Sequence, residues 1–310
     1  MENISTHLRP RNRWGFLILI GAMGLTTGAT LLAELGNWWL WLLAQILFAL
    51  AFLQWFVILH EAGHLTLFRH RRLNQIAGHL ASFFALIPFH SWQPIHARHN
   101  RWTGWQDLDA TTASLVPRKL RLFERAVIRG AWKTHLPLFS ILYRLTNFWY
   151  IPRIRKYIPV PQHKRMIVNS LILIVAYAVF LFIIGSASFL RCCGAGLILS
   201  LMIQDLLLLS QHTHIPQRLS QGQPVEPFPP HTQSQFTRSL QFPKWFSALI
   251  LHFDAHELHH MYMSVPGYEL HRIPIKQPNE VHWWTWLCEV KRLPGDVFLF
   301  KNQTQTGFKL

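Results

Sequence analysis

The chain has 310 residues, 50% of them hydrophobic, and a formal net charge of +16 at pH 7. Its apolar residues come in blocks too long for the core of a soluble domain, which indicates an integral membrane protein. The positive charge does not indicate a nucleic-acid-binding protein, because the basic residues flank the apolar blocks instead of gathering on a soluble module.

Four apolar runs have lengths that suit helices crossing a membrane. A helix rises about 1.5 Å per residue, so roughly 20 residues span the hydrocarbon core. The runs cover residues 14–32, 37–59, 167–190 and 195–210. We expect them to form two hairpins, the second of which turns at residues 191–194. The first run lacks a small-residue cleavage site and is too long for the apolar part of a signal peptide, so we interpret it as a span.

The distribution of basic residues predicts the orientation in the membrane. Of the 30 Lys and Arg, 3 precede the first run, 17 lie between the second and third runs, and 9 follow the fourth. Basic residues collect on the cytoplasmic side of membrane proteins. We therefore expect one all-α integral membrane domain, residues 1–310, with both termini cytoplasmic and a cytoplasmic cap of helices that carries the histidine clusters described below.

Residues 118–131 have the pattern of an amphipathic helix. Leu120, Phe123 and Val127 fall on one helical face, and arginines fall on the opposite face. This pattern fits a helix in the plane of the lipid headgroups, and equally a helix packed on the protein's own cytoplasmic cap.

Two segments near the carboxyl end have distinct compositions. Trp283, Trp284 and Trp286 form a tryptophan-rich stretch, which we expect to anchor this region at the membrane interface. Residues 217–235 are rich in Gln, Pro and Ser, and this composition predicts a flexible connection.

Histidines gather in four short clusters. They read HEAGH at residues 60–64, HARHN at 96–100, QHTH at 211–214 and HELHH at 256–260. Residues three or four positions apart share a face of a helix, so the first, second and fourth clusters each present paired imidazoles in one direction. Imidazole binds iron, copper, zinc and nickel, and no cysteine lies in the clusters. So many imidazoles exceed the needs of one ion and indicate a site for two transition metals.

The first cluster also fits a different class of enzyme. HEAGH matches the H-E-x-x-H pattern of zinc metalloproteases, in which two histidines hold zinc and the glutamate is the general base. A catalytic zinc takes three protein ligands and a water. A membrane zinc protease is therefore an alternative, but it leaves the other clusters without a role.

The clusters and their surroundings resemble the membrane fatty acid desaturase family, whose integral diiron members carry three histidine boxes. The stretches FHSWQPIHARHNRWTGWQDLDATT and HELHHMYMSVPGYELHRIP are similar to the regions of the second and third boxes. The resemblance runs from about the second apolar run to Pro274. Asn100 departs from it, because this residue stands where the second box normally ends in histidine. The matching box histidines are His60, His64, His96, His99, His256, His259 and His260.

The missing box histidine gives weight to the extra ligand that the resemblance implies between the second and third boxes. His212 is the candidate, and His214 is a second one. Asp205 lies seven residues before His212 on the same helix face, where we expect it to face the metals or to bond a neighbouring helix. Asn100 is a candidate ligand through its amide oxygen, directly or through a water.

The resemblance implies an O2-dependent enzyme with two irons that removes two hydrogens from a membrane-associated fatty acyl chain. Hydroxylation or ketolation of a lipid such as a carotenoid is the alternative within the same chemistry. A separate electron donor, ferredoxin or cytochrome b5, is implied, and an acidic donor suits the basic cytoplasmic surface. Four carboxylates are expected to support the ligands or the fold and not to transfer protons, namely Glu61, Asp107, Asp109 and Glu257.

Overall fold

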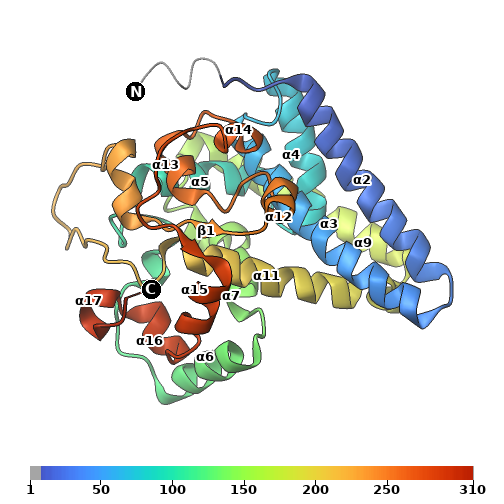
Figure 1. Ribbon diagram of the computed structural model, residues 1–310. Helices are drawn as coiled ribbons and strands as arrows, with labels where there is room; N and C mark the ends of the chain where they lie inside the picture. The colour runs from blue at the N-terminus through green and yellow to red at the C-terminus, as the bar shows by residue number, and fades with distance from the viewer. Residues whose placement is uncertain (1–7, 310) are drawn as a thin grey trace. The chain divides into compact units, whose positions relative to one another are not determined.

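The computed structural model describes residues 8–309, which are mostly helical (Figure 1). Residues 1–7, part of the amino-terminal segment expected to be cytoplasmic, and Leu310 lie outside the described residues. The chain forms two compact units. The first unit contains the described residues up to Pro94 together with Arg144–Gln204, and the second contains Ile95–Tyr143 and the residues from Asp205 onward.

Four segments of the described chain are long and apolar enough to cross a membrane, which confirms the four long apolar helices predicted from the sequence. They are Asn12–Glu34, Trp38–His64, Val160–Ile184 and Ser186–His212. The first two are helices α2 (Asn12–Glu34) and α3 (Trp38–His64). The third contains the short helix η3 (Val160–Gln162) and α9 (His163–Ile184), and the fourth contains α10 (Ser186–Phe189), η4 (Leu190–Gly194) and α11 (Ala195–His212).

The turn between the last two apolar segments is not where the sequence placed it. The predicted turn at residues 191–194 is the π-helical segment η4, and the helix direction breaks at Gly185 instead. Gly185 has φ 84° and ψ 135°, a conformation that a residue with a Cβ rarely adopts. The error arose because a run of apolar residues hides a single glycine, whereas Arg191 gave a polar signal inside a continuing helix.

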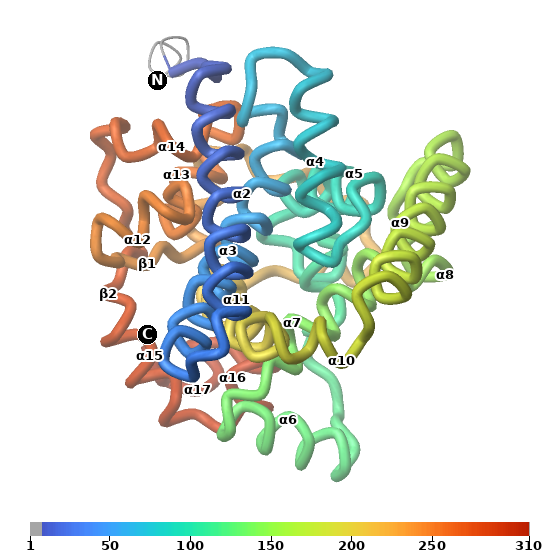
Figure 2. Tube along the Cα trace, turned by 90° about the vertical axis from the view of Figure 1, so that its right-hand side faces the viewer, coloured from blue at the N-terminus to red at the C-terminus, as the bar shows by residue number. Residues whose placement is uncertain are grey.

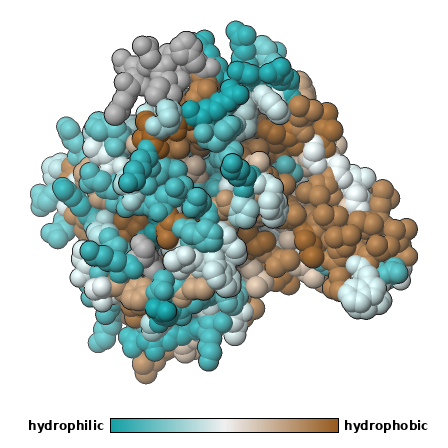
Figure 3. Space-filling view, viewed as in Figure 1, coloured by the Kyte–Doolittle hydropathy of each residue, from teal (hydrophilic) through white to brown (hydrophobic). Residues whose placement is uncertain are grey.

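Small residues let α2 pack closely on α3 and on the residues that follow α3. Gly15, Ala22 and Ala29 of α2 are its buried residues and recur every seventh position, so they form one stripe. Trp55 of α3 donates through Nε1 to the Thr26 hydroxyl at 3.0 Å, which adds an interhelical hydrogen bond. The apolar residues that α2 leaves exposed gather with those of α3 on the surface in Figure 3, as a lipid-facing surface requires.

The remaining elements are short. In the first unit or on its boundary they are α4 (Arg71–Ala85), α5 (Phe89–Trp102), η2 (Leu145–Trp149) and α8 (Ile151–Ile154). In the second unit they are η1 (Ala113–Leu115), α6 (Leu122–Thr134), α7 (Leu138–Arg144, whose last residue belongs to the first unit), η5 (Pro230–Phe236), α12 (Lys244–Leu249), α13 (His256–Met261), α14 (Gly267–Leu270), α15 (Trp283–Val290), α16 (Gly295–Phe300) and α17 (Gln303–Thr306). Strands β1 (Leu240–Gln241) and β2 (Val281–His282) pair in parallel, with Leu240 opposite Val281.

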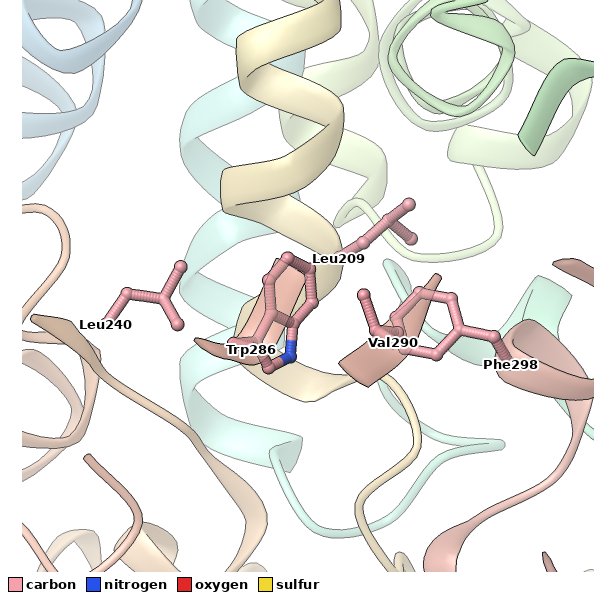
Figure 4. Close-up of a cluster of buried hydrophobic side chains, with 5 residues drawn as sticks. All are labelled: Leu209, Leu240, Trp286, Val290 and Phe298. Atoms are coloured by element: carbon pink, nitrogen blue, oxygen red, sulfur yellow. The ribbon is translucent and has the colours of Figure 1, made fainter. Parts of the chain in front are cut away.

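An apolar cluster holds the carboxyl-terminal helices of the second unit together. Figure 4 shows its members, Leu209, Leu240, Trp286, Val290 and Phe298, which come from α11, β1, α15 and α16. Trp286 is only 1% exposed, so the expectation that it anchors the chain at the membrane interface is wrong. Its ring fills the centre of this core, and sequence composition does not separate a core tryptophan from an interfacial one.

The predicted amphipathic helix is present as α6, and the second unit covers its arginine face. Arg129 of α6 pairs with Asp296 of α16 at 2.6 Å, and Trp132 stacks on Phe298 with ring centroids 4.9 Å apart. Phe123, on the apolar face expected either to lie in the headgroups or to pack on the cap, is 78% exposed, so it does not pack on the second unit. The arginine side of α6 therefore packs within the second unit, because Asp296 offers it a partner.

We predict that Gly196→Ala destabilises the fold. A Cβ at this position would lie 2.5 Å from Cβ of Phe48 and 2.7 Å from the backbone oxygen of Gln45, so α3 and α11 would have to move apart. Overpacking of this kind costs about 1–3 kcal/mol. The matched control is Gly24→Ala in α2, where a Cβ would meet no atom within 4 Å. Thermal unfolding in detergent, followed by tryptophan fluorescence, should show a lower Tm for Gly196→Ala alone, and equal Tm values would contradict the packing.

Candidate metal centre

Helix α13 carries the histidine-rich sequence HELHH into the interior of the second unit. His256, His259 and His260 are all buried, the most exposed of them at 4%. The backbone N–H of Glu257 in the first turn donates to the Ser239 hydroxyl at 3.0 Å, which satisfies one of the free amides at this helix end. Positions 256 and 260 share a helix face, so their imidazoles lie together, with ring centroids 4.6 Å apart.

Four histidines of the second unit converge on one point. His99 of α5, His212 at the end of α11, and His256 and His260 of α13 each offer a nitrogen, and these nitrogens all lie within 4.8 Å of one another. The Nε2 atoms of His256 and His212 are 2.8 Å apart, and those of His260 and His256 are 3.1 Å apart. We call these four residues the imidazole cluster.

The Nδ1 atoms of three cluster histidines contact oxygen acceptors. Nδ1 of His99 lies 2.7 Å from a carboxylate oxygen of Asp109, Nδ1 of His212 lies 3.1 Å from the backbone oxygen of Phe236, and Nδ1 of His260 lies 2.8 Å from Oε1 of Gln233. Each oxygen accepts a hydrogen bond if Nδ1 carries the proton. The Nε2 lone pair is then the free one, and it is directed into the cluster.

Asp109 is itself held in place by neighbouring groups. The backbone N–H and the hydroxyl of Thr111 donate to its Oδ1 at 2.8 and 2.9 Å. Burial alone would raise the pKa of Asp109, but its interactions with His99 and Thr111 outweigh burial and lower it. A carboxylate therefore persists beside His99 and fixes its ring.

The α13 histidines of the cluster are set up to bind a metal ion and not an additional proton. Burial holds the pKa of His256 and of His260 well below the usual value, and the neighbouring imidazoles lower both further. The rings of His256 and His260 are therefore neutral near pH 7, which is the form that binds metals. At these separations a ring that carries its proton on Nε2 donates to its neighbour, and a metal that replaces this proton binds the facing lone pairs. The donor set, four imidazole nitrogens and no thiolate, fits a transition metal such as iron, zinc or copper.

The other predicted ligands form pairs within the separate units. In the first unit His60 and His64 of α3 have ring centroids 4.7 Å apart, and Trp92 lies against both. In the second unit the rings of His96 and His259 lie 6.1 Å apart. Each pair therefore presents two buried or half-buried imidazoles side by side.

The four predicted supporting carboxylates divide into two groups. Glu61 joins Asp109 in contacting a histidine, because its Oε1 lies 3.2 Å from Nδ1 of His60 while Thr66 donates to its Oε2. Asp107 and Glu257 hold loops instead. Asp107 accepts from the backbone N–H of Ser220, and Glu257 accepts from the backbone N–H of Asn279.

The three further candidates have structural contacts in the second unit. Both ring nitrogens of His214 contact the carboxyl-terminal segment, Nδ1 at 2.8 Å from the backbone oxygen of Lys301 and Nε2 at 3.0 Å from the Thr306 hydroxyl. Asp205 accepts a hydrogen bond from the backbone N–H of Ser140 in the first turn of α7. Asn100 is buried one turn after His96, and its backbone oxygen accepts from Gln233 at 2.9 Å.

Gln233 is a site residue that the sequence analysis missed. Its Nε2 donates to the backbone oxygens of Asn100 and Phe228, which leaves Oε1 to contact His260. It lies in η5, which packs against α13, and is 1% exposed. The prediction of a flexible connection is therefore wrong for the end of residues 217–235. A glutamine in a Gln- and Pro-rich stretch carries no signal that separates it from its exposed neighbours.

Comparison of sequences identifies relatives of this chain. Residues 36–280 match the sequence model of the fatty acid desaturase family. The chain is 24% identical over 299 residues to an sn-1 oleoyl-lipid 12-desaturase of Picosynechococcus sp. The match covers 92% of this chain and 81% of that protein. A protein of the same name from Synechocystis sp. is 26% identical, covering 69% of this chain and 62% of the relative. A temperature-sensitive sn-2 acyl-lipid omega-3 desaturase (ferredoxin) of Arabidopsis thaliana is 23% identical, and the match covers 86% of this chain and 63% of the relative.

We predict that Asp109→Asn weakens metal binding without unfolding the protein. An amide keeps the shape of the carboxylate but loses the charge that orients His99, and loss of such a partner typically costs about 10- to 100-fold in affinity. The control is Asp107→Asn on the same loop, because Asp107 contacts Ser220 and no cluster histidine. Metal retained against a competing chelator is the measurement. Equal loss from both variants would show that the loop, and not the contact with His99, controls binding.

Proposed function

The chain belongs to the fatty acid desaturase family, and we propose that it introduces a double bond into a fatty acyl chain of a membrane lipid at two histidine-bound irons, with O2 as co-substrate. The observation that carries the proposal is the buried imidazole cluster inside a chain that matches this family over residues 36–280. Bound iron supplies the oxygen and electron-transfer chemistry that an unactivated C–H bond requires and that side chains lack.

The proposal gives the eight predicted histidines to two irons. His99, His212, His256 and His260 hold one iron through Nε2, and Asp109 and Gln233 keep two of these rings in the required orientation. By the histidine-box pattern and by count, the ligands that remain for the second iron are His60, His64, His96 and His259. Asn100 and Asp205 act through their structural contacts, and His214 is not a ligand.

Desaturation is favoured over the other activities considered. The relatives reported above are named desaturases, which supports it against hydroxylation or ketolation of a carotenoid-like lipid. The zinc protease alternative uses HEAGH alone, whereas the family match extends over all four histidine clusters. The names of the relatives contain oleoyl-lipid and acyl-lipid, and we propose an acyl group of a glycerolipid as the substrate here.

A separate electron carrier reduces the metals in this proposal. Relatives from Arabidopsis thaliana and Helianthus annuus carry ferredoxin in their names, which favours ferredoxin over cytochrome b5. The chain has a net charge of +16, so an acidic carrier is attracted to it at low ionic strength.

We also propose a topology of two hairpins with a cytoplasmic cap. The basic residues support it, because 17 of the 30 lie between the second and third apolar runs and 9 follow the fourth. The outer turns are then those at Gly36 and at Gly185, both glycines with positive φ. Every histidine cluster lies on the cytoplasmic side in this arrangement.

Expression in a host whose lipids contain monounsaturated acyl chains tests the activity. Wild-type protein with ferredoxin should yield lipids with an additional double bond by mass spectrometry, whereas His212→Ala should lose turnover and iron together. The control is His214→Ala, which removes an imidazole of the same sequence cluster and should keep its iron. Unchanged iron and activity in His212→Ala would show that this residue is not a ligand, and an added oxygen in the product lipid would favour hydroxylation.

Cysteine labelling tests the topology. In a cysteine-free background, Leu35→Cys and Ser186→Cys should react with a membrane-impermeant maleimide added outside intact cells. Gln223→Cys should react only after the cells are permeabilised. These three positions are exposed, so burial does not prevent labelling. Labelling of Gln223→Cys from outside would place the third histidine cluster on the wrong side for a shared site.

A further inference from the structure

An open groove of about 760 Å³ lies in the first unit and is lined by residues of α4, the start of α5, and α9. Figure 2 shows the paths of these helices. Its size is within the range of roughly 300–1,000 Å³ that is typical of sites for small molecules. None of its lining residues is a predicted metal ligand. The groove is therefore a separate feature whose lining can be interpreted without reference to the metals.

One end of the groove is cationic. Lys164 and Arg165, in the first turn of α9, line it together with His79 and His90, and no carboxylate is among the lining residues. Arg165 donates through Nε to Nε2 of His90 at 2.9 Å, so this imidazole is an acceptor. Among the described residues, neither Lys164 nor Arg165 forms an ion pair.

The two imidazoles add no positive charge of their own near pH 7. Burial, and then the charge of Arg165, lower the pKa of His79; these two causes and the neighbouring His79 lower the pKa of His90 to about 4. The groove end thus holds the two charges of Lys164 and Arg165 beside neutral rings. A negatively charged ligand would satisfy both cations at once.

The rest of the groove is apolar and follows a helix that is long enough to span a membrane. Val168, Ile172 and Ala176 recur every fourth residue of α9, so they form one stripe that begins beside the cations, and Phe83 of α4 lines the opposite side. Ile172 is 62% exposed and Val168 is 45% exposed. In a membrane these side chains contact hydrocarbon, because α9 lies within the apolar segment Val160–Ile184.

We propose that this groove binds a glycerolipid with an anionic headgroup, whose phosphate lies at Lys164 and Arg165 and one of whose acyl chains lies along Phe83, Ile172 and Ala176. The order of charge and then apolar surface along α9 is the order of a lipid from headgroup to tail. A free anion would leave the apolar stripe unused, and an acidic peptide would have to enter hydrocarbon. The site is independent of the proposed reaction, since it shares no residue with the metal ligands.

Spin-labelled lipids test the headgroup contact. The protein is placed in nanodiscs of phosphatidylglycerol and phosphatidylcholine in equal amounts, and electron spin resonance compares the immobilised fraction of each labelled lipid. Wild-type protein should immobilise phosphatidylglycerol preferentially. In the double variant Lys164→Gln with Arg165→Gln, this preference should fall about fivefold for each cation removed. The matched control, Arg155→Gln with Lys156→Gln, removes the same charge from residues that do not line the groove. The single variant Lys164→Gln leaves the contact between Arg165 and His90 intact, so it still tests the headgroup contact if the double variant misfolds.

A second arm tests the acyl-chain contact and separates a lipid from a free anion. Ala176→Trp fills the apolar stripe and should reduce the immobilised phosphatidylglycerol while the iron content stays at the wild-type value. Inorganic phosphate should not abolish the preference for phosphatidylglycerol. The proposal is overturned by equal immobilisation of the two lipids, by equal loss in the control, by a preference that Ala176→Trp leaves unchanged, or by full displacement with phosphate. Loss of iron in every variant would instead indicate that the fold has failed. In that case the single variant Lys164→Gln decides, because an unchanged preference with iron retained would contradict the proposal.

Discussion

The mutual approach of neutral imidazoles is the constraint on which the second unit depends. The Nε2 atoms of His212 and His256 lie 2.8 Å apart and those of His256 and His260 lie 3.1 Å apart, so donor nitrogens for a metal are side by side in a buried site. Oxygen partners on the outer nitrogens, such as Asp109 and Gln233, hold the rings in this arrangement. The fold therefore prepares the coordination geometry before a metal binds, and the binding energy is not spent on ordering the ligands.

These partners explain why loops of little regular structure are buried here. Gln233 in η5 contacts Asn100, Phe228 and His260, so one side chain links α5, the loop before η5, and α13. The backbone oxygen of Phe236, from the same η5 segment, contacts His212. Buried backbone and amide groups are costly unless they are hydrogen-bonded, and here the bonds that satisfy them also orient the ligands.

The sequence predicts those features of the structure that depend on residues close along the chain, and it misses features that depend on residues far apart in the sequence. Histidines three or four apart, and apolar runs of membrane length, are local patterns with local causes; the runs predicted four long apolar helices, and the spacing predicted the His60–His64 and His256–His260 pairs. The spacing did not predict that His96 lies beside His259 whereas His99 joins the imidazole cluster. The break at Gly185, the burial of Trp286 and the contact of Gln233 with His260 depend on neighbours distant in the sequence. Composition alone assigned each of these three residues to the wrong environment, because the same residue types occur in helices, at interfaces and in flexible connections.

The departure at Asn100 follows from the same geometry. In the family resemblance this position carries a histidine, yet the imidazole cluster contains four nitrogens without it, because His212 supplies one from α11. The backbone oxygen of Asn100 accepts from Gln233, whose other end contacts His260. A backbone oxygen is present in every residue type, so the contact constrains the path of α5 and not the identity of residue 100. The chain can therefore lack a histidine at this position and still keep the rings of the cluster in place.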